Sequence, residues 1–158
     1  MEIEKVIRQE KFKNPFQKAY INLIYTANYF RDTHVNIFAS HGIQGNHFNI
    51  LRILKGKYPE PVSPGYIKEV MLDKGCDLTR LVSKLVNLGL VTRGVCPGNK
   101  RKMDISLTTK GYETVEKISY DVNESDMQLK TLTDKEYEEL SQLLDKMRGE
   151  EKSFILQN

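Results

Sequence analysis

The chain has 158 residues, which suits one domain spanning 1–158, and its 39% hydrophobic and 28% charged residues are typical of a globular protein. No apolar run approaches the length of a membrane span, and the N-terminus lacks the apolar stretch of a signal peptide, so we expect a cytoplasmic protein without membrane contact. In that compartment Cys76 and Cys96 are expected to be free thiols.

Charge is distributed unevenly along the chain. Residues 51–111 carry 12 Lys and Arg against 5 Asp and Glu, whereas the remaining residues carry 12 against 16. A basic middle between acidic flanks predicts a polyanionic partner for the middle alone. A solvated basic face is the alternative interpretation.

Residues 14–40 are predicted to form one long helix. An apolar series recurs at every seventh residue and consists of Phe16, Leu23, Phe30 and Ile37. A seam of this length packs against other helices, in the same chain or in a partner. Three tyrosines on this helix, Tyr20, Tyr25 and Tyr29, are candidates for lining a pocket for a small aromatic effector, with core or interface packing as the alternative.

Two shorter helices follow. The segment "IQGNHFNILRILKGKYPEP" predicts the first, which Gly56 and Pro59 end. Ser63 is a candidate N-cap for the second, and Pro64 suits its first position. The buried face of this second helix is predicted to consist of Ile67, Val70 and Met71.

The segment "DKGCDLTRLVSKLVNLGL" predicts an amphipathic helix that Gly89 ends. Its apolar stripe consists of Leu78, Leu81, Val82, Leu85 and Leu88. Its other side carries small, hydroxyl, amide and cationic side chains: Cys76, Thr79, Arg80, Ser83, Lys84 and Asn87. Asp77 is an exception there, which we expect either to repel phosphate or to accept from a cytosine amino group.

A β-hairpin is predicted next. "LVTRGVCP" indicates one strand, and the alternation in "MDISLT" indicates the returning strand. The connection from Pro97 to Lys102 carries three consecutive bases, Lys100, Arg101 and Lys102, at the expected tip.

The C-terminal part is predicted to be helical and is acidic. Val115, Ile118 and Val122 mark one helix, with a less regular stretch at residues 123–126. Thr133 with Glu136 predicts a capping box for a last helix. The apolar side of that helix consists of Tyr137, Leu140, Leu144 and Met147.

A helix pair followed at once by a β-hairpin is a winged helix-turn-helix, whose second helix reads the DNA major groove. Arg80 suits a guanine or a phosphate, Thr79 and Ser83 suit bases or phosphates, and Lys84 suits phosphate. The basic tip is then expected to lie over the adjacent minor groove, where an inserted arginine such as Arg101 is favoured.

Residues 76–111 resemble the MarR family of bacterial transcriptional regulators. Thr79–Arg93 is similar to the family's recognition-helix pattern T-x-L-V-x-x-L-x-x-x-G-L-[VI]-x-R, and Ile105–Gly111 is similar to its [VI]-x-L-T-x-x-G pattern. Asn99–Arg101 stands where the family's wing has D-x-R, so the acid that orients the wing arginine is replaced by an amide. The flanking helices resemble the family in length and placement.

The resemblance implies a mainly α fold with a small two- to three-stranded antiparallel β-wing. It implies a DNA-binding lobe at 43–111 and helical dimerisation regions at 1–42 and 112–158. A homodimer would then act on a pseudo-palindromic operator in double-stranded DNA, as a repressor that a small-molecule effector releases. The expected DNA-binding residues are Lys74, Cys76, Thr79, Arg80, Ser83, Lys84, Arg93, Lys100, Arg101 and Lys102.

Other functions find less support in the sequence. His34, His41 and His47 lack the spacing of a helical zinc site, so neither metal nor cofactor is expected, although Cys76 is a candidate redox sensor. No phosphate loop or nucleophile elbow suggests an enzyme. The remaining alternative is a winged helix that sequesters another regulator by protein contact, which would expose aromatic residues or leucines over 76–87.

Overall fold

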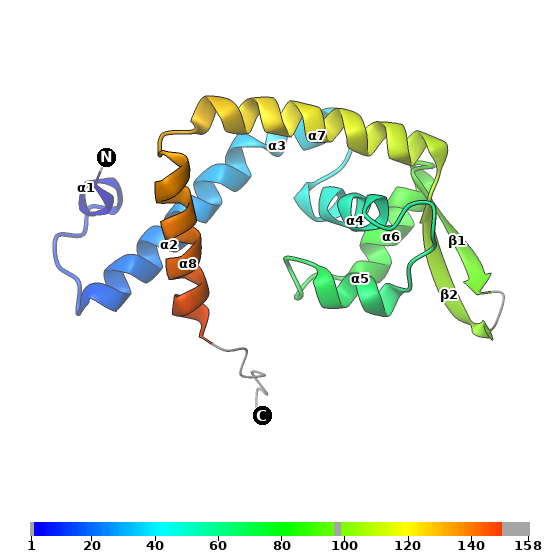
Figure 1. Ribbon diagram of the computed structural model, residues 1–158, viewed down its shortest axis with the longest axis horizontal. Helices are drawn as coiled ribbons and strands as arrows, with labels where there is room; N and C mark the ends of the chain where they lie inside the picture. The colour runs from blue at the N-terminus through cyan, green and yellow to red at the C-terminus, as the bar shows by residue number, and fades with distance from the viewer. Residues whose placement is uncertain (1, 97–98, 150–158) are drawn as a thin grey trace. The chain divides into compact units, whose positions relative to one another are not determined.

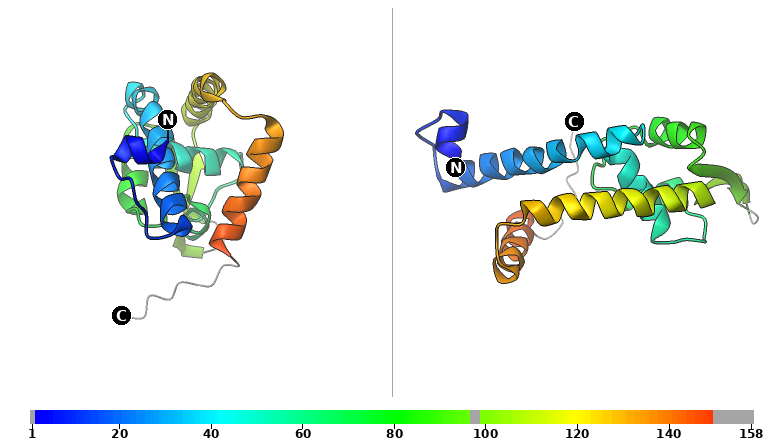
Figure 2. Two further views of the ribbon diagram at one scale, coloured as in Figure 1. Left: turned by 90° about the vertical axis from the view of Figure 1, so that its left-hand side faces the viewer. Right: turned by 90° about the horizontal axis from the view of Figure 1, so that it is seen from above.

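The computed structural model describes residues 2–96 and 99–149, with the side chains of all but residues 95–102. The chain divides into two compact units, Met1–Ser125 and Asp126–Asn158. Figures 1 and 2 show the elements in chain order: α1 (Ile3–Ile7), α2 (Pro15–Thr33), α3 (Val35–Ser40), α4 (Gly45–Lys55), α5 (Pro64–Val70), α6 (Leu78–Asn87), β1 (Val91–Cys96), β2 (Asn99–Leu107), α7 (Thr109–Leu129) and α8 (Asp134–Arg148). The predicted mainly α fold with a small antiparallel β-wing is confirmed. Along the described residues, no helix has the length and apolar character that crossing a membrane requires.

The single helix predicted for residues 14–40 is wrong, because it is two helices that meet at His34. Asn14 caps α2 by accepting from the Gln17 amide at 2.8 Å. At the other end the Thr33 hydroxyl donates to the carbonyl of Phe30 at 2.7 Å. Such side-chain bonds to the preceding turn compete with the backbone ladder, and this one lies at the last residue of α2.

The predicted apolar seam of α2 is exposed within one chain. No residue of α2 is buried. Phe16 is 67% exposed, and the other apolar side chains of α2 that are substantially exposed are Tyr20, Leu23, Ile24, Tyr25, Tyr29 and Phe30. This surface is far more apolar than a helix that only faces water requires.

The core lies between α3, α4, α5, α6, the hairpin and the first half of α7. Its fully buried side chains are Ile50, Leu51, Leu54, Ile67, Val82, Leu85, Val91, Val115 and Ile118. The predicted N-cap of α5 is confirmed, since Ser63 Oγ accepts from the Tyr66 amide at 3.2 Å. Val70 departs from its predicted burial and is 41% exposed, because α5 turns only Ile67 inward before it ends.

The hairpin is antiparallel, with Val91 opposite Leu107 and Val95 opposite Met103. β2 begins at Asn99, so Lys100–Lys102 belong to the strand and the predicted connection from Pro97 to Lys102 is too long. Cys96 still pairs with Asn99, and the register shifts between Val95 and Cys96, so Lys100–Lys102 lie in the strand between the paired residues Asn99 and Met103. A third strand is reduced to one bridge, in which Val62 and Ile105 exchange two hydrogen bonds of 2.9 Å.

The stretch 123–126, predicted to be less regular, is helical and lies inside α7. Asn, Ser and Asp each cost a helix well under about 1 kcal/mol, and neither Gly nor Pro interrupts the segment, so the helix propagates through it.

The first turn of α7 is tied to the C-terminal end of α6. The Thr108 hydroxyl donates to the carbonyl of Gly89 at 2.8 Å and accepts from the Gly111 amide at 2.9 Å. The Lys110 ammonium donates to the carbonyl of Leu88 at 2.9 Å. These bonds satisfy carbonyls that a helix C-terminus leaves without partners. They explain the L-T-x-x-G sequence after the hairpin.

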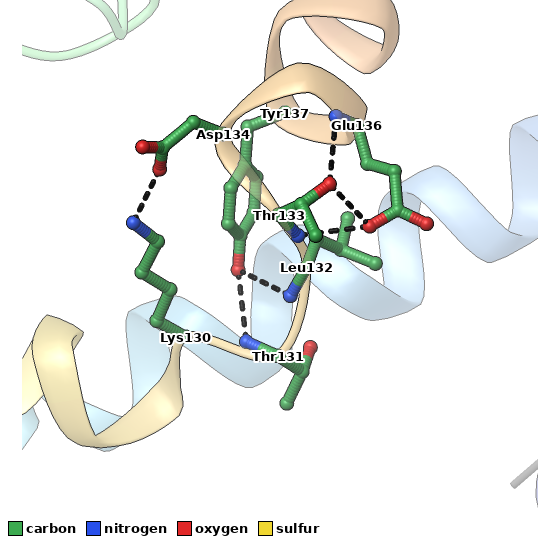
Figure 3. A network of polar contacts seen from close by, with 7 residues as sticks. All are labelled: Lys130, Thr131, Leu132, Thr133, Asp134, Glu136 and Tyr137. Carbon is green, nitrogen blue, oxygen red and sulfur yellow. Dashed lines mark hydrogen bonds and ion pairs between the residues drawn. The ribbon is translucent and has the colours of Figure 1, made fainter.

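The capping box predicted for α8 is confirmed (Figure 3). Glu136 accepts from the Thr133 amide at 2.8 Å, and Thr133 Oγ1 accepts from the Glu136 amide at 3.3 Å. The Tyr137 hydroxyl accepts from the Thr131 amide at 3.1 Å, which fixes the chain before the helix. No residue of α8 is buried, and its most exposed large apolar side chain is Leu143, at 63%.

Candidate nucleic-acid interface

Helix α6 is the second helix of a helix-turn-helix formed with α5 (Figure 1). It packs through Val82 and Leu85, which are buried, and it ends before Gly89, whose φ of +70° suits glycine. The loop before it is held by α4, because Asn49 accepts from the Leu72 amide at 3.0 Å and Asn46 donates to Asp73 at 2.9 Å. The position of α6 is therefore fixed from both ends.

The outer side of α6 is polar and cationic, as the sequence predicts. Thr79, Arg80 and Lys84 are exposed. Arg80 and Lys84 lie one helical turn apart, so the two cations share one face. Aromatic residues and leucines, which a protein-binding surface would present, are not exposed on this part of α6.

Asp77 is the N-cap of α6, a role that the sequence reasoning missed. Its carboxylate accepts from the Arg80 amide at 3.1 Å. The bond replaces one that the first turn of a helix lacks, and the negative charge is favourable at a helix N-terminus. The signal for this role in the sequence is an Asp directly before an apolar-periodic run, and the prediction that Asp77 faces the groove does not use it.

Lys74 and Cys76 lie in the loop before α6 rather than on the helix. Lys74 is exposed. Cys76 is half-buried, and its thiol donates to the carbonyl of Asp73 at 3.1 Å. The backbone carbonyl of Cys76 accepts from the Lys68 ammonium at 2.8 Å. The thiol and the carbonyl of Cys76 thus take part in holding the loop.

Arg93 and Ser83, two further sequence-predicted DNA contacts, bind each other. Arg93 on β1 donates from Nη2 to Ser83 Oγ at 2.8 Å and to the carbonyl of Thr79 at 3.1 Å. The Ser83 hydroxyl donates to the same carbonyl at 2.8 Å. The hairpin and α6 are therefore joined through polar side chains as well as through the core.

Of the predicted connection from Pro97 to Lys102, residues 99–102 are described only in their backbone, and residues 97–98 lie outside the described residues. Lys100, Arg101 and Lys102 lie in β2, and the hairpin projects from the helical lobe beside α5 and α6 (Figure 1). The side chains of Cys96 and of these three bases lie outside the described residues, so their predicted roles stay predictions.

A cleft of about 840 Å³ separates the end of α2 and α3 from the start of α4 and from α6. Its lining is mixed, with apolar, amide and charged side chains: Arg31, Val35, Phe38, Ala39, Ile43, Gln44, Asn46, Asp73 and Lys84, together with Gly42 and Gly45. Tyr20, Tyr25 and Tyr29, the sequence-predicted effector residues, lie on the exposed surface of α2 and not in this cleft.

His47 is buried beside the cleft, 3% exposed, at the start of α4. Its Nδ1 accepts from the Gln44 amide at 3.1 Å, which caps the helix and requires the neutral ring. Burial lowers the pKa of His47 below its ordinary value, and the charge of Lys84 lowers it further. Within the described residues, no three His, Cys, Asp or Glu side chains are grouped as metal ligands.

The arrangement of α5, α6 and the β1–β2 hairpin defines a winged helix-turn-helix protein. Neither the protein-family models nor the curated proteins include a match to the sequence. Among solved structures, a MarR transcription factor from Planctomyces limnophilus is 28% identical over 85% of this chain and 98% of that one, with a TM-score of 0.65. An S. aureus MepR–DNA complex is 20% identical over 87% and 97%, with a TM-score of 0.72.

A third similar structure is a MarR-family regulator from Rhodococcus sp. RHA1, which is 16% identical over 86% of this chain and 96% of that one, with a TM-score of 0.69. The chain therefore has a MarR-like winged-helix fold.

Proposed function

We propose that this protein is a transcriptional regulator that binds double-stranded DNA with sequence specificity. The observation that carries the proposal is the exposed face of α6, where Thr79, Arg80 and Lys84 project from a helix held by a buried apolar side. Such a helix presents donors to base edges and cations to phosphates. Two of the similar structures are described as a MarR transcription factor and a MarR-family transcriptional regulator, and the third is a complex with DNA.

In this proposal the two DNA-contacting elements have different roles. Arg80 and Thr79 work in the major groove, and Lys84 and Lys74 contact phosphates. Arg101, flanked by Lys100 and Lys102, enters the adjacent minor groove from the hairpin. Because Asn99 carries no charge to orient Arg101, we expect the wing to respond mainly to the depth and potential of that groove.

We also propose that two copies assemble through their helical regions. Support comes from α2 and α8, which expose large apolar side chains within one chain, among them Phe16, Tyr20 and Leu143. A second copy is the partner that covers such surfaces symmetrically. Two recognition helices roughly 34 Å apart then meet successive major grooves of a pseudo-palindrome.

We propose repression with release by a small aromatic effector in the cleft between α3 and α6. The apolar wall includes Val35 and Phe38, and Arg31 and Lys84 supply positive charge. A ligand there touches both α3 and the recognition helix, so it favours one arrangement of them. DNA is released if that arrangement has the lower affinity for the operator.

Fluorescence anisotropy with labelled duplexes tests the DNA-binding proposal. Arg80→Ala should lower affinity for a selected duplex by about 1–3 kcal/mol if Arg80 reads a base. Lys117→Ala is the matched control, because it removes one exposed positive charge from α7 and should leave affinity nearly unchanged. Equal binding by wild type and Arg80→Ala on every duplex would contradict the assigned surface.

A further inference from the structure

We infer that Arg93 is a positioning residue that locks the wing to the recognition helix, rather than a ligand of DNA. The inference rests on the proposed function and changes the role that the sequence suggests for two residues, Arg93 and Ser83. It concerns the contact between the start of α6 and the middle of β1.

The pairing register places the Arg93 side chain on the inner face of the hairpin. In an antiparallel pair, residues opposite each other point to the same face, and alternate residues of a strand share a face. Arg93 lies opposite Ile105 and two residues from Val91, and both of these are buried. Arg93 therefore shares the strand face of these two core residues, although its own side chain is exposed.

The guanidinium uses this placement to reach α6. Its Nη2 donates to Ser83 Oγ at 2.8 Å and to the carbonyl of Thr79 at 3.1 Å. Ser83 is oriented for this role, because its hydroxyl donates to the Thr79 carbonyl and so turns its lone pairs toward Arg93. The three groups form a closed network across two elements.

The same network uses the hydroxyl of Ser83 both as a donor and as an acceptor. Its single hydrogen is donated to the Thr79 carbonyl and its oxygen accepts from Arg93, so it has no proton left for a phosphate or a base. The DNA-reading side chains of α6 are then Thr79, Arg80 and Lys84, which are exposed. Arg93 is exposed as well, but its guanidinium is bound to Ser83 and to the Thr79 carbonyl, so these two side chains fix the angle at which the other three are presented.

The hydrogen bonds between Arg93 and α6 matter more for sequence specificity than for sequence-independent affinity for DNA. The recognition helix and the wing must enter two neighbouring grooves together, and a site held by supporting hydrogen bonds keeps the geometry that base readout needs. Binding to arbitrary DNA depends on phosphate charge and tolerates small changes of angle. Loss of the lock should therefore reduce the preference for the right sequence.

The test compares wild type, Arg93→Ala, Ser83→Ala and the double variant of the full chain. Anisotropy titrations use a duplex selected from a random pool and a scrambled duplex of equal length, over a range of KCl concentrations. Each single variant removes the charge-assisted hydrogen bond between Arg93 and Ser83. The ratio of the affinity for the selected duplex to that for the scrambled duplex should therefore fall about tenfold in each single variant. The double variant should lose no more than Arg93→Ala alone, because both changes break one network.

Two results would overturn the inference. If Arg93 binds a phosphate, Arg93→Ala weakens both duplexes alike and reduces the slope of log K against log salt by about 0.9. If Arg93 only stabilises the fold, the melting temperature falls while the affinity ratio is unchanged. Ser83→Ala removes the hydrogen bond without lowering helix propensity, so a fall in the affinity ratio of this variant cannot be attributed to misfolding of α6.

One measurement detects the hydrogen bonds of Arg93 in the absence of DNA. In the free protein, NMR of the arginine side chains should show slow exchange of the Arg93 guanidinium protons, and Ser83→Ala should abolish it. Fast exchange in wild type would refute the lock. Failure of wild type to bind any duplex would refute the proposed function instead.

Discussion

Replacing Gly111 by alanine tests the junction between α7 and the end of the recognition helix. A Cβ on Gly111 would lie 2.8 Å from the carbonyl carbon of Leu90, closer still to its oxygen, and 3.1 Å from Leu107 Cδ2. The Leu90 carbonyl is backbone, and it already accepts from the Thr108 amide at 3.1 Å, so it cannot rotate away. The substitution therefore forces α7 away from the hairpin and α6.

The expected cost can be estimated from these contacts. Overpacking a filled site costs about 1–3 kcal/mol and more where backbone must shift, whereas alanine in place of glycine within a helix gains about 1 kcal/mol. For Gly111→Ala we expect a net loss of about 3 kcal/mol, because the clash is with backbone. With a urea dependence of about 2 kcal/mol/M, the unfolding midpoint should fall by about 1.5 M.

Urea unfolding followed by circular dichroism at one protein concentration is the assay. Gly94→Ala is the matched control, because a Cβ there meets no atom within 4 Å, and its midpoint should change little. Helix propensity alone predicts the opposite sign for Gly111→Ala. An unchanged or raised midpoint would refute the packing of α7 against Leu90.

Three smaller changes test other local contacts. Asp77→Ala should lower the free energy of unfolding by about 1 kcal/mol, and Asp77→Asn, which keeps the acceptor, by much less in the same urea assay. Because the pKa of His47 is lowered in the folded state, the unfolded chain binds the proton first; stability should fall as pH drops below about 6.5 and through the folded pKa. In His47→Gln, measured by the same unfolding at pH 7.5 and 5, this component should disappear. Thr133→Ala should cost about 1 kcal/mol and fray α8 in hydrogen exchange, because the Glu136 backbone amide loses its acceptor.

Local signals in the sequence predicted much of the fold. Ser63 and Thr133 were recognised as caps because their side-chain chemistry and spacing act within one turn. The interruption at His34 has no signal of its own in the sequence, because the apolar period continues unbroken from Phe30 to Ile37. The sequence prediction of a less regular stretch at residues 123–126 is wrong, because the low helix propensities of Asn, Ser and Asp are too small to end α7.

The candidate site was predicted as a set of residues but not as a set of roles. The exposed positions of Arg80 and Lys84 follow from helical periodicity. The use of Arg93 and Ser83 to join two elements does not, because it depends on the pairing of Arg93 with Ile105 and on the angle between strand and helix. The cleft likewise draws on segments far apart in the sequence, from Arg31 to Lys84, and no single stretch indicates it.

Selection of bound duplexes from a random pool, followed by footprinting at a stated salt concentration, tests the central claim most directly. The account predicts one enriched pseudo-palindrome with half-sites about 10 base pairs apart, protected in successive major grooves. It also predicts that Arg80→Ala loses this enrichment. Enrichment of the same sequence by Arg80→Ala, or of none by wild type, would contradict a recognition role for α6.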